Sequence, residues 1–69
     1  MGDPRLASRL KEARTAAGLT QAELAERAGV SRKTVNTVEN GVFIPSTVLA
    51  LSLARALGTT VDELFWLAD

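Results

Sequence analysis

The sequence contains no cysteine and no histidine. Without cysteine there can be no disulfide and no thiolate metal site. Without histidine as well, most metal sites and the common general-base and nucleophile arrangements are excluded. Scattered carboxylates such as Glu23 and Glu26 have a simpler interpretation as a helix cap and a solvated helix face. We therefore expect a protein that is not an enzyme and that has no metal site and no cofactor.

The sequence also lacks any long hydrophobic run. No stretch approaches transmembrane length, and the N-terminus has no apolar segment of the signal-peptide type. There is no internal repeat and no low-complexity segment. The 69 residues therefore predict one small domain over 1–69, with no membrane partner and with a location in a prokaryotic cytoplasm or nucleoid.

An excess of charge of one sign is missing too, because eight Lys and Arg residues balance eight Asp and Glu residues. The distribution is uneven, since residues 1–41 carry a net charge of +2 and residues 42–69 a net charge of −2. The positive half could face a polyanion, although a neutral chain is weak support for one. Such a small excess predicts weak non-specific affinity for DNA at physiological salt.

What the sequence does contain is a helix-turn-helix pattern in residues 19–41, LTQAELAERAGVSRKTVNTVENG. Thr20 and Glu23 have the spacing of a capping box, which predicts the start of a helix. Gly29 can supply the positive φ of a sharp turn, and Ser31 is a good N-cap for the next helix. Asn40-Gly41 predicts the end of that second helix. The inward-facing positions of the two helices are Leu24, Ala25 and Ala28, then Val35 and Val38.

The outer face of the second helix, predicted over residues 32–40, is rich in hydrogen-bond donors and contains no acid. Its members are Arg32, Lys33, Asn36, Thr37 and Asn40. A donor-rich face without carboxylates suits the major groove of DNA. An ordinary solvated helix face is the alternative interpretation, but the caps and turn at the right offsets favour DNA reading.

The remaining signals predict an all-α domain of five helices. A first helix is expected from Pro4 to about Ala17, with Leu6, Leu10 and Ala13 buried. A fourth begins at Pro45-Ser46 and reaches about Leu57. A fifth begins at a second capping box, Thr60 and Glu63, and runs through about Trp66. No segment alternates with the period of a strand.

From about Arg9 to Phe65 the chain resembles the Cro and lambda-repressor type helix-turn-helix family, also called the Xre family. The resemblance lies in LTQAELA at 19–25, GVS at 29–31, VENG at 38–41 and PSTVLALSLARALGTTVDELF at 45–65. It implies a compact five-helix, lambda-repressor-like DNA-binding domain with its helix-turn-helix at about 20–40. One departure is Val42, where family members often carry a lysine or arginine that binds a phosphate, and valine cannot take that role.

The resemblance also implies roles for individual residues. Base reading falls to Arg32, Lys33, Asn36 and Thr37, and phosphate contact to Gln21, Ser31 and Asn40. Arginine can bond to guanine and asparagine to adenine, and which of the four residues reaches a base stays open. Ser31 is open as a cap, a phosphate contact or both. Arg14 and Glu39 match an ion pair that ties the first helix to the third.

An apolar excess predicts a partner surface. Helix 45–57 carries more apolar residues than one core-facing stripe needs, and residues 42–44 form an apolar loop. Only one of Phe65 and Trp66 can easily point inward. The candidate surface for a dimer or partner is Val42, Phe43, Ile44, Leu49 and Trp66. The alternative is that Phe43, Ile44 and Phe65 complete a small core.

These observations favour a sequence-specific regulator of transcription, most simply a repressor, that binds double-stranded DNA. It would act as a homodimer on a palindromic operator with half-sites ~34 Å apart. One alternative is an antitoxin or a restriction-modification controller whose apolar surface binds a protein partner. Another is the N-terminal domain of a longer regulator, and a third is an interaction module that has lost DNA binding.

Overall fold

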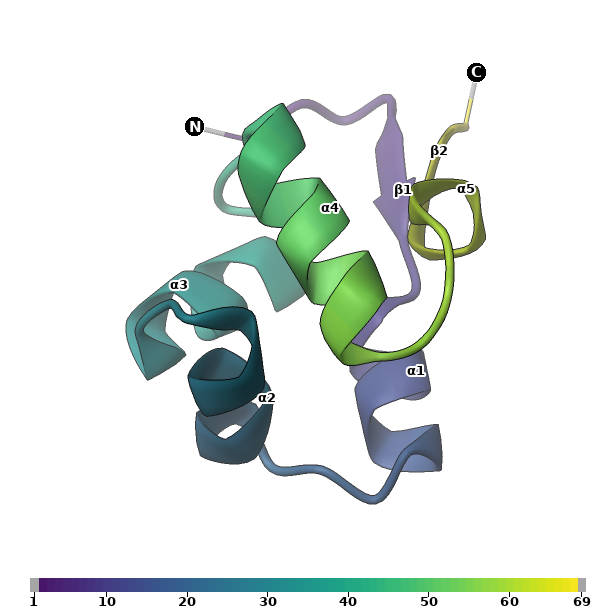
Figure 1. Ribbon diagram of the computed structural model, residues 1–69. Helices are drawn as coiled ribbons and strands as arrows, with labels where there is room; N and C mark the ends of the chain where they lie inside the picture. Colours follow the sequence, from purple (N-terminus) through teal and green to yellow (C-terminus); the bar gives the residue numbers. More distant parts are fainter. Residues whose placement is uncertain (1, 69) are drawn as a thin grey trace.

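The computed structural model describes residues 2–68, in which five helices and two short strands are arranged around one core (Figure 1). In chain order the elements are β1 (Leu6–Ser8), α1 (Leu10–Ala16), α2 (Gln21–Ala28), α3 (Arg32–Glu39), α4 (Thr47–Ala56), α5 (Val61–Leu64) and β2 (Phe65–Leu67). The longest helix, α4, has 10 residues and packs against both α2 and α5. Among residues 2–68, no helix is long and apolar enough to cross a membrane.

The core takes side chains from all five helices and from β2, so one cluster holds the small fold together. Its members are Leu10, Leu24, Ala25, Val35, Val38, Ala50, Leu53, Ala54, Leu64 and Phe65. The helical periodicity predicted the inward stripes of α2 and α3 correctly. Small residues such as Ala25 and Ala54 lie where helices approach closely, which lets α2 contact both α3 and α4.

The first helix is shorter than the sequence predicted. Instead of a helix from Pro4, residues 6–8 form β1, and α1 begins only at Leu10. The backbone N–H of Arg9 donates to the carbonyl of Leu64 at 2.9 Å, and that of Leu10 donates to the hydroxyl of Ser8 at 3.1 Å. These bonds satisfy groups that a longer helix would have bonded internally, so tertiary pairing overrides the local helix signal.

The fifth helix is also shorter than expected, and the all-α prediction is wrong in this respect. After α5 the chain turns extended, and β2 pairs with β1 in antiparallel register, Ala7 opposite Trp66. The side chain of Thr60 makes no cap hydrogen bond, so the second predicted capping box is absent. The prediction that one aromatic points inward is confirmed, since Phe65 is buried and Trp66 is 41% exposed.

The local signals around the helix-turn-helix are confirmed. Thr20 and Glu23 form a complete capping box, and Ser31 caps α3 by accepting from the N–H of Thr34. Gly29 ends α2 in the left-handed conformation with φ of 73°. Helix α3 ends at Glu39, one residue earlier than predicted, because Asn40 is its C-cap and the left-handed turn falls on Gly41. These caps fix the angle between α2 and α3.

Candidate nucleic-acid interface

The outer face of α3 presents side chains of unequal accessibility. Arg32, Lys33, Asn36 and Asn40 are exposed. Thr37 is half-buried, and its hydroxyl donates to the carbonyl of Thr34 at 3.0 Å, so it is the least available of the predicted base-reading residues. Gln21, at the start of α2, lines one shallow hollow together with Arg32, Lys33 and Asn36. The structure therefore brings residues of both helices together on one face.

Three side-chain amides on this face are joined by hydrogen bonds. The Nε2 of Gln21 donates to Oδ1 of Asn36 at 3.2 Å. The Nδ2 of Asn40 donates to the same oxygen at 3.1 Å. Asn36 is therefore held from both ends of the face. This amide chain was not predicted, because the sequence shows only that the three residues are polar and outward-facing.

A buried ion pair lies directly beneath the amides. The Nε of Arg14 lies 2.6 Å from Oε2 of Glu39, and these side chains are only 11% and 2% exposed. A second guanidinium nitrogen donates to the carbonyl of Leu19 at 2.8 Å. The hydrogen bond to the Glu39 carboxylate raises the pKa of Arg14 above its ordinary value, so the guanidinium stays charged although burial opposes this. The ion pair and the bond to Leu19 connect three segments: α1, α3 and the loop that precedes α2.

The ion pair and the amides are connected through Gln21. Besides its bond to Asn36, the Nε2 of Gln21 donates to Oε1 of Glu39 at 3.1 Å. The same carboxylate oxygen also accepts from Arg14 at 3.2 Å. Both amide hydrogens of Gln21 are thus engaged within the protein. A phosphate contact by Gln21 would fall to its backbone N–H at the start of α2, or would require the amide to exchange partners.

Ser31 and Thr34 form a second local contact on the face, which sequence reasoning missed. Their hydroxyl oxygens lie 2.9 Å apart, and Ser31 also accepts from the N–H of Thr34 at 3.1 Å. The cap role of Ser31 is therefore visible in the structure, while its phosphate role stays a prediction. The spacing of three residues between Ser31 and Thr34 was the signal that could have found this pair.

The candidate partner surface is largely exposed. Phe43 and Ile44 are 43% and 50% exposed, so these two do not complete the core, whereas Phe65 does. Leu49 is half-buried and packs on the core, which removes much of its side chain from that surface. The Arg9 guanidinium lies over the Trp66 ring, 5.0 Å from its centroid, as a cation–π contact.

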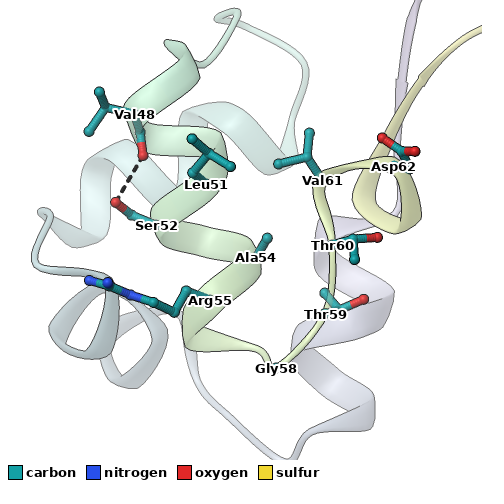
Figure 2. A pocket seen from close by; sticks show the side chains of 10 residues that line it. All are labelled: Val48, Leu51, Ser52, Ala54, Arg55, Gly58, Thr59, Thr60, Val61 and Asp62. Atoms are coloured by element: carbon teal, nitrogen blue, oxygen red, sulfur yellow. Dashed lines mark hydrogen bonds between the residues drawn. The ribbon is translucent and has the colours of Figure 1, made fainter.

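The apolar surface continues along α4. Val48 and Leu51 are exposed there, and an open hollow beside them is lined on the other side by residues 58–62 (Figure 2). Figure 2 shows Leu51 on α4 and Val61 across the hollow from it. A second hollow, between β1, α4 and Phe65, shares both Leu51 and Val61. Exposed apolar residues thus gather along this side of α4, and contiguous apolar patches of this kind can mark sites that bind proteins.

Comparison with known proteins places this geometry in a family. A helix-turn-helix family model matches residues 10–64. An uncharacterized HTH-type transcriptional regulator of Methanothermobacter thermautotrophicus is 48% identical over 61 residues, which covers 87% of this chain and 88% of that protein. The uncharacterized HTH-type transcriptional regulator YgzD of Bacillus subtilis is 37% identical, over 90% of this chain and 94% of its own.

Two solved structures share the fold. The restriction-modification controller protein C.AhdI from Aeromonas hydrophila superposes with a TM-score of 0.77 at 45% identity, covering 80% of this chain and 83% of its own. The clp gene regulator ClgR from Corynebacterium glutamicum superposes with a TM-score of 0.74 at 35% identity. That match covers 78% of this chain and 57% of ClgR.

Proposed function

Because the chain belongs to the helix-turn-helix family of DNA-binding transcriptional regulators, we propose that it represses transcription by holding α3 in the major groove of a specific operator. The observation that carries the proposal is the acid-free, donor-rich face of α3, held rigidly by caps and by the Arg14–Glu39 pair. Occupancy of the operator would block polymerase. The protein would act in the cytoplasm, where bacterial and archaeal DNA lies.

Individual roles follow from accessibility. Arg32, Lys33 and Asn36 are exposed near the start and middle of α3, where recognition helices contact base edges. Thr37 is half-buried and would contribute at most at the rim. The phosphates would be contacted by Ser31, by Asn40 and by the first N–H groups of α2 beside Gln21.

A dimer would supply the affinity that one domain lacks. The net charge is zero, and Val42 stands where a cation would add a phosphate contact, so non-specific attraction is weak. Linking two domains makes the second half-site binding intramolecular and raises affinity without new contacts. The exposed apolar surface on the 42–44 loop, α4 and Trp66 is the proposed homodimer contact, on a palindrome with half-sites ~34 Å apart.

The similarity to C.AhdI favours a second candidate function. C.AhdI is 45% identical to this chain over most of both proteins. A controller of a restriction-modification system is therefore a specific alternative to a general repressor. DNA recognition by α3 would be the same, and the target gene would differ. The match to ClgR, of which this chain covers 57%, favours the N-terminal domain of a longer regulator as a further candidate.

The test is selection from a random duplex pool, followed by affinity measurements on the enriched site at fixed salt. Arg32→Ala/Lys33→Ala is expected to weaken specific binding by at least ~30-fold, since each base contact is worth about 1–3 kcal/mol. Lys11→Ala/Arg55→Ala removes the same charge from exposed positions on α1 and α4 and is the matched control. Circular dichroism verifies that both variants fold. Equal losses in the two variants would refute the assignment of α3.

A further inference from the structure

The carboxamide oxygen of Asn36 has no free lone pair. It accepts one hydrogen bond from Gln21 at 3.2 Å and another from Asn40 at 3.1 Å. A carbonyl oxygen of this kind offers two acceptor sites, and both are occupied. Within residues 2–68, the NH2 group of Asn36 donates no hydrogen bond, and the side chain is exposed. Asn36 therefore presents donors to its surroundings and keeps its acceptor for the protein.

The orientation of this amide is set by the buried ion pair. A carboxylate can only accept, so the group of Gln21 that faces Oε1 of Glu39 must be its NH2. The same nitrogen of Gln21 also donates to Asn36, so the Asn36 group on that side must be its oxygen, Oδ1. Asn40 bonds to this oxygen too, and it must therefore do so with its NH2 group. Arg14 holds the Glu39 side chain in place through the ion pair. Turning any one amide around would set donor against donor or acceptor against acceptor.

Two exposed neighbours of Asn36 have the same donor polarity. Arg32 and Lys33 carry donors only. Thr37 differs, because its hydroxyl hydrogen is directed to the carbonyl of Thr34 and its oxygen is left as an acceptor, but this side chain is half-buried. Gln21 and Asn40 turn their nitrogens to Asn36, which leaves each oxygen on the other side of its amide. The exposed groups that Asn36, Arg32 and Lys33 offer to a ligand are thus donors, and the free amide oxygens of Gln21 and Asn40 lie on the sides of those amides that face away from Asn36.

We infer that Asn36 reads DNA as a donor alone and selects guanine over adenine. This inference rests on the proposed function. In the major groove guanine presents two acceptors, N7 and O6, whereas adenine presents one acceptor, N7, and one donor, the N6 amino group. An asparagine with a free oxygen would bond to both groups of adenine. Here the oxygen of Asn36 is already occupied and cannot accept from the adenine amino group, while both guanine atoms can receive hydrogens from Asn36, Arg32 or Lys33.

The experiment uses the full chain and a random duplex pool. Asn36→Ala is expected to relax selection at one base pair of each half-site, which identifies the pair that Asn36 reads. The unsubstituted protein is expected to select guanine there, and replacing it by adenine should weaken binding about tenfold, a typical cost when a good base contact is removed. Binding is compared at one salt concentration for all four bases at that pair.

Gln21→Met supplies the decisive comparison. Methionine has a similar length but no donor, so one lone pair of Asn36 becomes free and the preference for guanine over adenine should fall about tenfold. Gln21→Lys keeps a donor toward Asn36 and Glu39 and should retain the guanine preference. If residue 21 also contacts a phosphate, its substitution weakens binding to all DNA sequences equally. The ratio of the affinities for guanine and adenine sites is then unchanged by the phosphate contact, so it reports only the effect on Asn36.

Several results would overturn the inference while leaving the proposed function standing. These are a selected site with adenine at the Asn36-dependent pair, a Gln21→Met variant with an unchanged base ratio, or an Asn36→Ala variant that relaxes no pair. A pool in which no sequence is enriched would instead overturn the proposed function, and the inference with it. Thermal melts of each variant verify that the fold is kept.

Discussion

Glu39 is a buried carboxylate that joins the Arg14 ion pair to the amides on the outer face of α3. Removing it from water is costly, and the cost is offset only because Arg14 and Gln21 together donate three hydrogen bonds to its two oxygens. Its partner Arg14 is satisfied by a further bond to Leu19. A small domain with a modest core thus has a polar anchor between α1, α2 and α3.

The first prediction concerns this pair. Glu39→Gln would leave the Arg14 guanidinium buried without a counter-charge, so the free energy of unfolding should fall by about 3 kcal/mol. Urea unfolding followed by circular dichroism measures it. The double variant Arg14→Met/Glu39→Met, which has no buried charge, should recover part of the loss. A change below about 1 kcal/mol in the single variant would mean that solvent already screens the pair.

The capping box of α2 predicts a pH dependence. The backbone N–H of Thr20 donates to the Glu23 carboxylate at 2.8 Å. Hydrogen bonding with the backbone and side chain of Thr20 lowers the pKa of Glu23 from its ordinary 4.5. A lowered pKa means that the contribution to stability is complete above pH 4.5 and is lost as the pH falls through the lower, folded-state value. Glu23→Gln can still accept the bond but cannot titrate.

We therefore expect unfolding free energies of the unsubstituted protein and Glu23→Gln to converge as the pH falls below 4.5. Asp3, whose side chain is 27% exposed, titrates in a lower pH window, since its hydrogen bonds with Arg5 lower its pKa from 3.8 to about 2. It therefore keeps its contribution while that of Glu23 begins to fall. Two stability curves that stay parallel from about pH 6 to about pH 3 would refute the assignment.

At the scale of elements, the turn between α2 and α3 requires glycine at position 29 for its backbone conformation, and not because a larger side chain would collide with a neighbour. Gly29 has φ of +73°, and a Cβ built there would meet no atom within 4 Å. The left-handed conformation costs most residues roughly 1–2 kcal/mol, and asparagine tolerates it better. The glycine is needed because two short helices must turn sharply and still share one core.

The prediction at this scale compares two substitutions. Gly29→Ala should destabilise the domain by about 1 kcal/mol or more and lower its melting temperature, because alanine strains the turn. Gly29→Asn should lose less, since its side chain can bond locally in this conformation. Thermal unfolding measures both. Equal losses in the two variants would point to a steric cause instead.

At the scale of the whole molecule, the two ends of the chain are joined. Strands β1 and β2 lie side by side (Figure 1) and pair with Leu6 opposite Leu67. The Arg9 guanidinium lies over the Trp66 ring. Trp66 lies opposite Ala7 on this strand pair and stays 41% exposed. Trp66 is the one tryptophan in the chain, so its fluorescence reports on that region.

The dimer prediction uses Ile44→Glu/Leu51→Glu, two exposed positions that line the same hollow. Two carboxylates in an apolar interface would repel and lose solvation, so sedimentation equilibrium should shift from dimer to monomer. Affinity for a palindromic operator should drop while affinity for one half-site is retained. Lys11→Glu adds negative charge on α1 and should leave the dimer intact. An unsubstituted chain that is monomeric with and without its operator would overturn the dimer.

The sequence by itself determined the middle of this protein. Thr20, Ser31 and Gly29 act on their immediate neighbours, so the bounds of α2 and the start of α3 could be predicted from local caps and a turn. Helical periodicity predicted the inward-facing residues of these helices. The residues of α3 that do not face inward form the donor-rich outer face, so this face could be predicted as well. The roles of that face in DNA binding are still predictions.

Only the tertiary structure decided the ends and the polarity of the face. Strands of three residues have no periodicity of their own, and residues 6–8 become extended because they pair with residues 65–67, far away in the chain. The amide of Asn36 could point either way until Glu39, reached through Gln21, imposed one direction. Local interactions choose helices and turns, whereas hydrogen bonds between distant segments choose strand partners and the orientation of each side chain.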